Sequence, residues 1–223
     1  MASFNSEIID PPSYDDTALF ERICRDLVTD GFSICHNALP PGLSESLAIQ
    51  ASSYHDQVFE SAGIGRGQQF EKNTQIRTDQ ILWIEGDSPV GQKWLDWTSS
   101  LQSYINRRLF LGLFSFESHF SHYPPGSFYK RHMDAFKGQS NRILTLVTYL
   151  NHDWKERDGG ALKLYRCSDD QRGITILPDF GTLVVFLSED FPHEVLTTHR
   201  DRLSIAGWFR LNNSQGGVID PPN

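Results

Sequence analysis

The sequence predicts a mostly β protein: a double-stranded β-helix, or jelly roll, with N-terminal helices packed on one outer face. Two observations support this prediction. Apolar residues recur at helical spacing in the first half of the chain, whereas short β-rich segments separated by Gly, Pro and Asn or Asp turns fill the part that follows Phe114. Many short strands beside a helical segment are typical of a jelly roll with a helical cover.

Three helices are expected before residue 114. The first carries apolar residues at helical spacing, and it is followed by Gly31, a residue type that often ends helices. The third is rich in Trp and Leu. The helices are expected over residues 15–29, 41–60 and 89–109, with short strands over 32–35 and 81–84.

The second half of the chain predicts the strands of the jelly roll. They are expected over residues 114–123, 129–134, 144–150, 161–165, 182–188, 193–197 and 203–210. A chain of 223 residues fits one domain with a sizeable core. We expect that domain over residues 14–211, between an N-terminal tail (1–13) and a polar C-terminal tail (212–223).

The composition excludes several classes of protein. A formal net charge of −8 argues against nucleic-acid binding, which usually requires a basic surface. No run approaches the roughly 18 apolar residues of a membrane-spanning helix, and residues 1–16 lack the apolar stretch of a signal peptide. The chain has an odd number of cysteines, and they are widely spaced: Cys24, Cys35 and Cys167. This pattern favours reduced cysteines that pack in the core over a redox-sensing thiol. We therefore expect a cytoplasmic protein, and a monomer.

A His-x-Asp pair, His132 and Asp134, is followed at a distance by His193. Side chains at i and i+2 of a strand share a face, so the pair could reach one metal ion from a single strand. With His193, two histidines and one carboxylate would leave three positions open, which suits non-haem Fe(II) and oxygen chemistry. A polar cluster or a zinc site is the alternative. His199 and Asp201 form a second such pair, but no histidine follows them.

Arg202 is a candidate anion-binding residue. It lies nine residues after His193, next to the last predicted strand. A guanidinium grips a carboxylate through two parallel hydrogen bonds, so Arg202 could hold the carboxylate of a metal-bound co-substrate. A surface charge is the alternative.

Several ordered motifs surround these residues. They are Ile76–Ile84, the turn Tyr123–Gly126, Tyr149–Asn151, Asp158–Gly160, Pro192–Val195 and Arg202–Trp208. From about Phe32 to Arg210 the chain resembles the prolyl hydroxylases of the Fe(II)- and 2-oxoglutarate-dependent dioxygenases, especially the oxygen-sensing branch and its bacterial relatives. The resemblance implies Fe(II) as cofactor, 2-oxoglutarate and O2 as co-substrates, and ascorbate as reductant.

The resemblance also implies roles for residues around the metal. Arg202 and Tyr149 would bind the distal carboxylate of 2-oxoglutarate, and Tyr123 would contact its metal-proximal end. In the family a threonine often lies four residues after the arginine, but this chain has Ala206 there. Ser204 shares the strand face of Arg202 and is expected to supply the hydroxyl contact instead.

Two further positions match residues that border the substrate in relatives, namely Arg142 and Trp208. Simple core packing is the alternative for Trp208. His119 shares a strand face with Tyr123 and is expected either to line the metal pocket or to be a hydrogen-bonded core residue.

A glycine-containing polar segment, residues 61–74, is interpreted as a lid over the substrate, as in relatives. It does not lie between a strand and a helix, which argues against a dinucleotide-binding loop. Arg77 and Asp79 follow it, and they are expected to pair and brace the lid; a plain surface pair is the alternative.

The resemblance therefore implies an Fe(II)- and 2-oxoglutarate-dependent prolyl 4-hydroxylase that acts on a proline in a flexible segment of a protein. Bacterial relatives point to elongation factor Tu as the target. One alternative is a dioxygenase of the same mechanism that acts on another side chain or on a small molecule. The other is a non-catalytic jelly-roll binding module.

Overall fold

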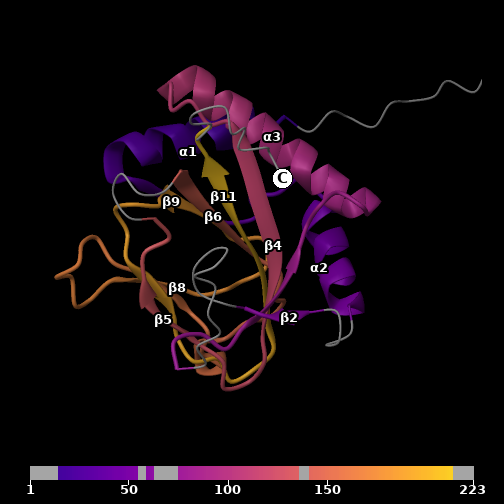
Figure 1. Cartoon of the computed structure of the whole chain (residues 1–223). Helices are drawn as coiled ribbons and strands as arrows, with labels where there is room; N and C mark the ends of the chain where they lie inside the picture. The colour runs from indigo at the N-terminus through magenta and orange to yellow at the C-terminus, as the bar shows by residue number, and fades with distance from the viewer. Residues whose placement is uncertain (1–14, 55–58, 63–74, 136–140, 213–223) are drawn as a thin grey trace, which may run out of the picture.

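The computed structural model describes residues 15–54, 59–62, 75–135 and 141–212. Its strands form two antiparallel sheets that face each other (Figure 1). The larger sheet has the order β1-β9-β6-β11-β4-β3-β2 and the smaller one β5-β10-β7-β8. The larger sheet comprises β1 (Phe32–Cys35), β2 (Glu60–Ser61), β3 (Gln80–Trp83), β4 (Ser115–Tyr123), β6 (Arg142–Tyr149), β9 (Leu183–Leu187) and β11 (Arg202–Arg210). The smaller sheet comprises β5 (Tyr129–His132), β7 (Leu162–Leu164), β8 (Ile174–Ile176) and β10 (His193–Val195).

Three α-helices cover the outer face of the larger sheet (Figure 1). They are α1 (Thr17–Asp30), α2 (Leu43–Ser53) and α3 (Pro89–Leu109), and a short 3-10 helix, η2, spans Glu156–Asp158. Buried side chains of the helices and of the sheet form one apolar cluster that includes Ile23, Leu47, Trp94 and Phe209. Burial of this face holds the helices in place, since amphipathic helices gain most of their stability from packing.

A second apolar cluster lies between the two sheets. It includes Val147, Tyr149, Leu164 and Phe186, which come from both sheets. Because successive strand residues point to opposite faces, each central strand contributes to both clusters. On β6, for example, Leu146 faces the helices and Val147 faces the second sheet. The candidate site occupies this inter-sheet layer.

Local sequence signals explain where the long helices begin and end. Gly31 ends α1 with a φ of 79°, a conformation that glycine adopts without steric cost, and its N–H donates to the carbonyl of Leu27. Ser88 caps α3 by accepting a hydrogen bond from the N–H of Gly91 at 2.9 Å, and Pro89 occupies the first turn.

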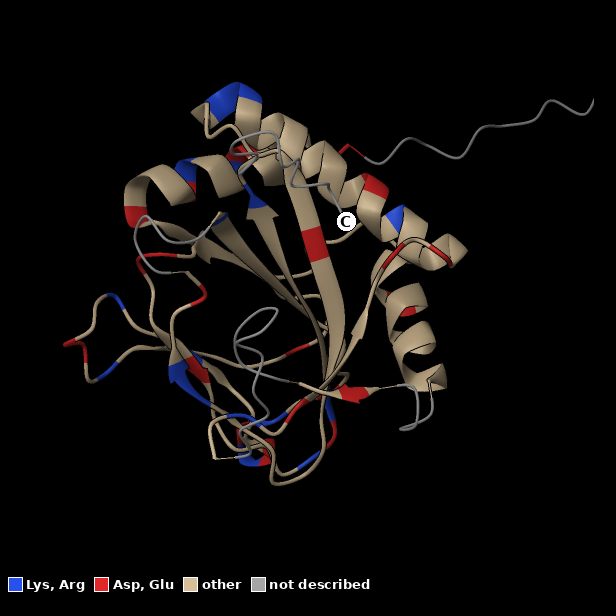
Figure 2. Cartoon of the chain, in the orientation of Figure 1, with Lys and Arg blue, Asp and Glu red and all other residues tan. Residues whose placement is uncertain are grey.

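Figure 2 shows few charged residues on the long strands and many on the loops at the lower end of the view.

The predicted fold class, a jelly roll with helices on one face, is confirmed. Several boundaries were wrong. The second helix ends at Ser53 rather than near residue 60, where the short strand β2 lies instead, and the strand β8 was not predicted. Most of the predicted lid and tails lie outside the described residues. None of the described helices is long and apolar enough to cross a membrane.

Candidate active site

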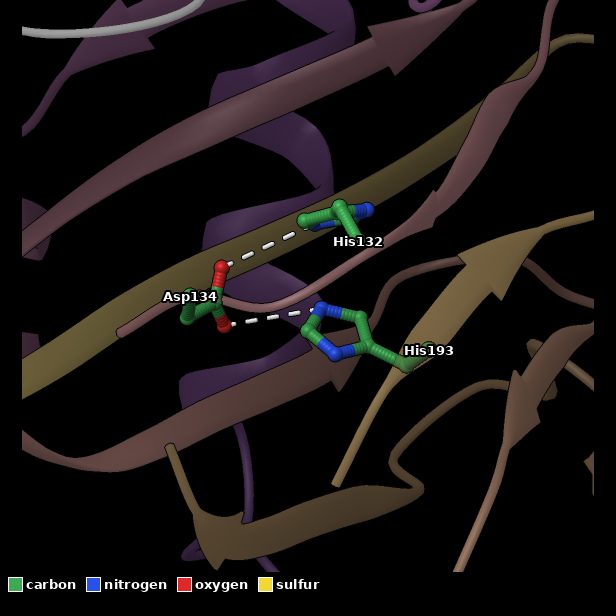
Figure 3. A group of neighbouring side chains, drawn as sticks. All are labelled: His132, Asp134 and His193. Atoms are coloured by element: carbon green, nitrogen blue, oxygen red, sulfur yellow. Dashed lines mark ion pairs between the residues drawn. The ribbon is translucent and has the colours of Figure 1, made fainter. Parts of the chain in front are cut away.

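The inter-sheet layer contains a cluster of possible metal ligands: His132, Asp134 and His193 (Figure 3). His132 ends β5 and His193 begins β10, and the two residues pair directly across these strands. Nε2 of His132 lies 3.7 Å from Oδ1 of Asp134, and Nε2 of His193 lies 3.5 Å from Oδ2. A His-x-Asp pair and a histidine about 60 residues later thus converge on one point, and the side chains of His132, Asp134 and His193 are 16%, 7% and 6% exposed.

One part of the strand prediction was wrong. We expected His132 and Asp134 to share a face of one strand, but β5 ends at His132 and Asp134 lies in a bend beyond it. The alternation rule predicted the convergence of the two side chains although the second residue is not in a strand. The position of Asp134 must therefore depend on contacts other than strand pairing.

The two histidines present the same nitrogen to the cluster. Nδ1 of His132 lies 2.8 Å from the carbonyl of Lys130, and Nδ1 of His193 lies 3.0 Å from the carbonyl of Phe191. Each Nδ1 therefore carries the proton, and each Nε2 has a free lone pair for a metal ion.

The protonation of the cluster also suits a cation. Burial lowers the pKa of His193 to about 4, so that its imidazole is neutral at pH 7. Burial alone would raise the pKa of Asp134, but the facing imidazoles of His193 and His132 hold that pKa well below its usual range. Two imidazoles that turn Nε2 toward one carboxylate match the ligand set of non-haem Fe(II) sites.

A second feature of the same layer is the buried guanidinium of Arg202. The residue is 1% exposed. Its Nε donates to the carbonyl of Gly160 at 2.8 Å, and one terminal nitrogen donates to Oγ of Ser204 at 3.1 Å. Among the described residues, no carboxylate forms an ion pair with this guanidinium, although a buried charge is costly unless it is paired.

Two tyrosine rings flank this guanidinium. Its central carbon lies 4.8 Å from the ring centre of Tyr123 and 5.1 Å from that of Tyr149. The buried hydroxyl of Tyr149 has no hydrogen-bond partner among the described residues. Burial raises the pKa of Tyr149 to about 12, against the opposing effect of Arg202, so the hydroxyl keeps its proton and can donate. We call Arg202, Tyr149, Tyr123 and Ser204 the anion pocket.

Strand register assembles the anion pocket. Arg202 pairs with Tyr123 on β4, and Ser204 pairs with Tyr149 on β6. Gly160 completes the pocket with a φ of 65°, and a Cβ there would lie 3.0 Å from the side chain of Arg202. The glycine of the Asp158–Gly160 motif is therefore required by both backbone conformation and the close approach of the arginine.

Comparison with known proteins agrees with this geometry. A family model described as the 2OG-Fe(II) oxygenase superfamily matches residues 118–210. The crystal structure of a prolyl-4-hydroxylase from Pseudomonas putida is 38% identical with a TM-score of 0.77, and the match covers 86% of this chain and 99% of that chain. This chain belongs to the 2OG-Fe(II) oxygenase superfamily. It is a 2-oxoglutarate-dependent dioxygenase with the His-x-Asp…His triad of the superfamily.

Two further relatives of this oxygenase are a solved structure and a curated protein. A Trichoplax adhaerens prolyl hydroxylase, solved in complex with a peptide fragment of the oxygen degradation domain of hypoxia inducible factor, is 30% identical. It has a TM-score of 0.77, and the match covers 87% of this chain and 90% of that chain. Egl nine homolog 1 of Homo sapiens is 28% identical over 187 residues, which are 80% of this chain and 43% of that protein. The oxygenase chain thus spans less than half the length of this curated relative.

The predicted substrate residues Arg142 and Trp208 lie together in this oxygenase. The guanidinium carbon of Arg142 is 3.6 Å from the ring centre of Trp208, and two of its nitrogens donate to Oε1 of Glu117 at 3.0 and 2.7 Å. A nitrogen of Arg210 lies 3.3 Å from the other oxygen of Glu117. Nε1 of Trp208 is buried and has no partner among the described residues.

His119 adjoins this group. Its ring lies 5.4 Å from that of Trp208 and 5.2 Å from that of Trp83, and its Nδ1 lies 3.0 Å from Oγ of Ser121. Burial lowers its pKa to about 4, so the imidazole is neutral at pH 7. We call Arg142, Glu117, His119 and Trp208 the Trp208 cluster.

Arg77 and Asp79 form a two-bond ion pair at 2.8 and 2.6 Å. The pair is buried, with side-chain exposures of 12% and 0%, and is therefore not a plain surface pair. The guanidinium of Arg77 also lies 4.3 Å from the ring centre of Tyr129, and that ring stacks on the candidate ligand His132 with centroids 3.5 Å apart. The lid that this pair was expected to brace lies largely outside the described residues.

Sequence reasoning missed two hydroxyls beside the metal cluster. Oγ1 of Thr145 lies 2.7 Å from Oδ2 of Asp134, and Oγ of Ser188 lies 2.9 Å from Oγ1 of Thr145. Thr145 could have been found, because it is four residues before Tyr149 on β6 and so shares its face. Ser188 carries no such signal, since it reaches the site only through the register of β9 with β6.

Proposed function

We propose that this oxygenase is an Fe(II)- and 2-oxoglutarate-dependent prolyl 4-hydroxylase that acts on a prolyl residue of a protein. His132, Asp134 and His193 would hold Fe(II) through Nε2 of each histidine and the carboxylate. Arg202 and Tyr149 would bind the distal carboxylate of 2-oxoglutarate, with Tyr123 and Ser204 as further pocket residues.

The observation that carries this proposal is the unpaired charge of the anion pocket. A fully buried guanidinium without a carboxylate partner among the described residues lies beside an unpartnered, protonated tyrosine hydroxyl. One bound carboxylate would satisfy both groups, and it would gain charge-assisted hydrogen bonds. The pocket lies in the same layer as the metal cluster, so one dicarboxylate could reach both.

When bound, Fe(II) with 2-oxoglutarate and O2 supplies the oxidation of a C–H bond, with succinate and carbon dioxide as co-products. The protein residues orient these groups. The anion pocket fixes one end of the co-substrate, and the apolar side chains between the sheets exclude water. The three protein ligands leave positions open, so co-substrate and oxygen need displace no side chain.

The substrate is proposed from the relatives and from the Trp208 cluster. The Pseudomonas putida relative is a prolyl-4-hydroxylase by name, and the Trichoplax adhaerens relative was solved with a peptide. The target proline would be bordered by four residues: Arg142, Trp208, Arg77 and Asp79. Elongation factor Tu is the target that we propose to test first.

We further propose a reductant, a physiological role and a cellular location. Ascorbate would keep the iron reduced, and the dependence of the reaction on O2 would allow the protein to act in oxygen sensing. We propose a cytoplasmic location, which suits the free thiols of Cys24, Cys35 and Cys167.

The test measures succinate release from 2-oxoglutarate with elongation factor Tu, with prolyl peptides and with small metabolites. Mass spectrometry then searches the products for a gain of about 16 Da on proline, the mass of one oxygen atom. Proline hydroxylation coupled to succinate supports the proposal. Faster turnover with a free amino acid or a metabolite would favour the alternative substrate class. No succinate release with any substrate, despite 2-oxoglutarate binding, would favour a binding module.

A further inference from the structure

We propose that Thr145 and Ser188 are positioning residues that hold the Asp134 carboxylate in its metal-binding orientation. This inference rests on the proposed function of Asp134 as a metal ligand. It concerns two residues outside the triad and outside the anion pocket.

The three candidate ligands differ in how the backbone supports them. His132 and His193 pair with each other across β5 and β10, so strand hydrogen bonding fixes both. Asp134 lies in a bend two residues beyond the end of β5. The one acidic ligand therefore needs a side-chain contact to hold it at the cluster.

Thr145 provides that contact from the middle of the larger sheet. It lies on β6, where it pairs with Trp208 of β11 on one side and with Phe186 of β9 on the other. Its backbone is thus held by two neighbouring strands. Its hydroxyl lies 2.7 Å from Oδ2 of Asp134. This hydrogen bond ties the bend that carries Asp134 to a central strand of the larger sheet.

The chemistry of the groups fixes the direction of each hydrogen bond. A carboxylate that binds a metal ion is ionised and can only accept hydrogen bonds, and Oγ1 of Thr145 is its donor. Thr145 must therefore donate its single hydroxyl proton to Asp134. The contact of 2.9 Å between Thr145 and Ser188 is then a bond that Ser188 donates. The result is a directed chain from Ser188 through Thr145 to Asp134.

Water cannot easily replace either hydroxyl. Thr145 is 1% exposed and Ser188 is 0% exposed. The bond to Oδ2 fixes the rotation of the carboxylate and leaves Oδ1 on the side of His132. Groups that orient metal ligands in this way commonly change metal affinity by about 10- to 100-fold when they are removed.

The experiment measures the dissociation constant of Mn(II), a redox-stable probe for this site, by calorimetry on the full chain. Thr145→Val keeps the shape of the side chain and removes its hydroxyl. We expect Mn(II) binding to weaken about tenfold or more. Ser188→Ala should weaken it less, by about two- to fivefold, because Thr145 keeps its own bond. Thr145→Ser restores the hydroxyl and should bind Mn(II) within about threefold of wild type.

Thr148→Val is the matched control. Thr148 lies on the same strand and is 0% exposed, but its hydroxyl donates to the carbonyl of Thr182 at 3.2 Å. It shares the face of Leu146 and points to the helices. This variant should bind Mn(II) within about twofold of wild type, while its loss of stability in thermal unfolding resembles that of Thr145→Val.

Asp134→Ala distinguishes failure of the proposed ligand set from failure of the positioning role of Thr145 and Ser188. If it binds Mn(II) as wild type does, the proposed ligand set is wrong. If it loses binding while Thr145→Val matches Thr148→Val, the ligand set stands and the positioning role is overturned. Should Thr145→Val fail to fold, Ser188→Ala decides: unchanged Mn(II) affinity would overturn the inference, and weakened affinity would support it.

Discussion

Two arginines face the same inter-sheet layer in opposite electrostatic situations. Arg142, in the Trp208 cluster, has a carboxylate partner, Glu117, at 2.7 Å, and it shares this carboxylate with Arg210. Arg202, in the anion pocket, is more deeply buried and has no carboxylate partner among the described residues. A cation that already has a carboxylate partner does not require an anionic ligand, whereas a buried cation without such a partner does. The same residue type therefore indicates a substrate surface in one region and a co-substrate pocket in the other.

The largest expected effect concerns the metal cluster, on which both regions depend. His193→Ala should reduce turnover at least about 100-fold and greatly weaken Mn(II) binding, because three ligands fix the metal and none is spare. Calorimetry and succinate release measure the two effects. His199→Ala, in the exposed turn of the second His-x-Asp pair, is the control and should leave both unchanged. Near-normal turnover of His193→Ala would mean that His193 is not a ligand of the catalytic metal.

The second prediction separates the two arginines. Arg202→Ala should weaken 2-oxoglutarate binding about 30-fold or more, since loss of a charged partner in a desolvated pocket costs about 2–5 kcal/mol. Equilibrium binding with Mn(II) present measures this change. Arg200→Ala removes a cation two residues away whose side chain is 45% exposed, and it should bind 2-oxoglutarate as wild type does. Equal affinities of the two variants would place the carboxylate elsewhere.

The third prediction concerns His119 in the Trp208 cluster. Burial lowers its pKa to about 4, with an opposing effect of Asp79. The unfolded chain therefore takes up this proton first as the pH falls from about 6.5 to about 4. Folding should lose on the order of 3 kcal/mol from this group across that window, and the loss should end below about pH 4.

Chemical denaturation of the metal-free protein at several pH values checks this prediction. In His119→Gln the slope of the unfolding free energy with pH should be smaller between about pH 4 and 6.5 than in wild type. A slope unchanged by the substitution would mean that His119 is not held neutral by burial.

The smallest expected effect tests the substrate role of the Trp208 cluster. Trp208→Phe removes the buried, unpartnered indole N–H. It should lower kcat/KM for a protein substrate about fivefold, the worth of one ordinary hydrogen bond, while 2-oxoglutarate affinity stays within about twofold. Trp97→Phe removes an indole N–H that donates to Asp16 on the helix side, and it should not lower kcat/KM. Equal effects of the two variants on kcat/KM would contradict a specific contact of Trp208 with substrate.

The sequence predicted the placement of Arg202 and Ser204 on one strand face better than it predicted the surroundings of the metal cluster, for a physical reason. Arg202 and Ser204 lie on one long strand, so alternation alone places both on the same face. The bend at Asp134 breaks that rule, and the alternation cannot show where a strand ends. Thr145 and Ser188 meet only because β6 and β9 pair in one register, which a single sequence does not specify.

The central claim is that Arg202 binds the distal carboxylate of a 2-oxo acid held at the metal. A double-mutant cycle tests it directly: the affinities of 2-oxoglutarate and of 2-oxopentanoate, which lacks the distal carboxylate, are measured for wild type and Arg202→Ala with Mn(II) bound. Wild type should prefer 2-oxoglutarate about 30-fold or more, and Arg202→Ala should lose most of that preference. An equal preference in both proteins would contradict the account.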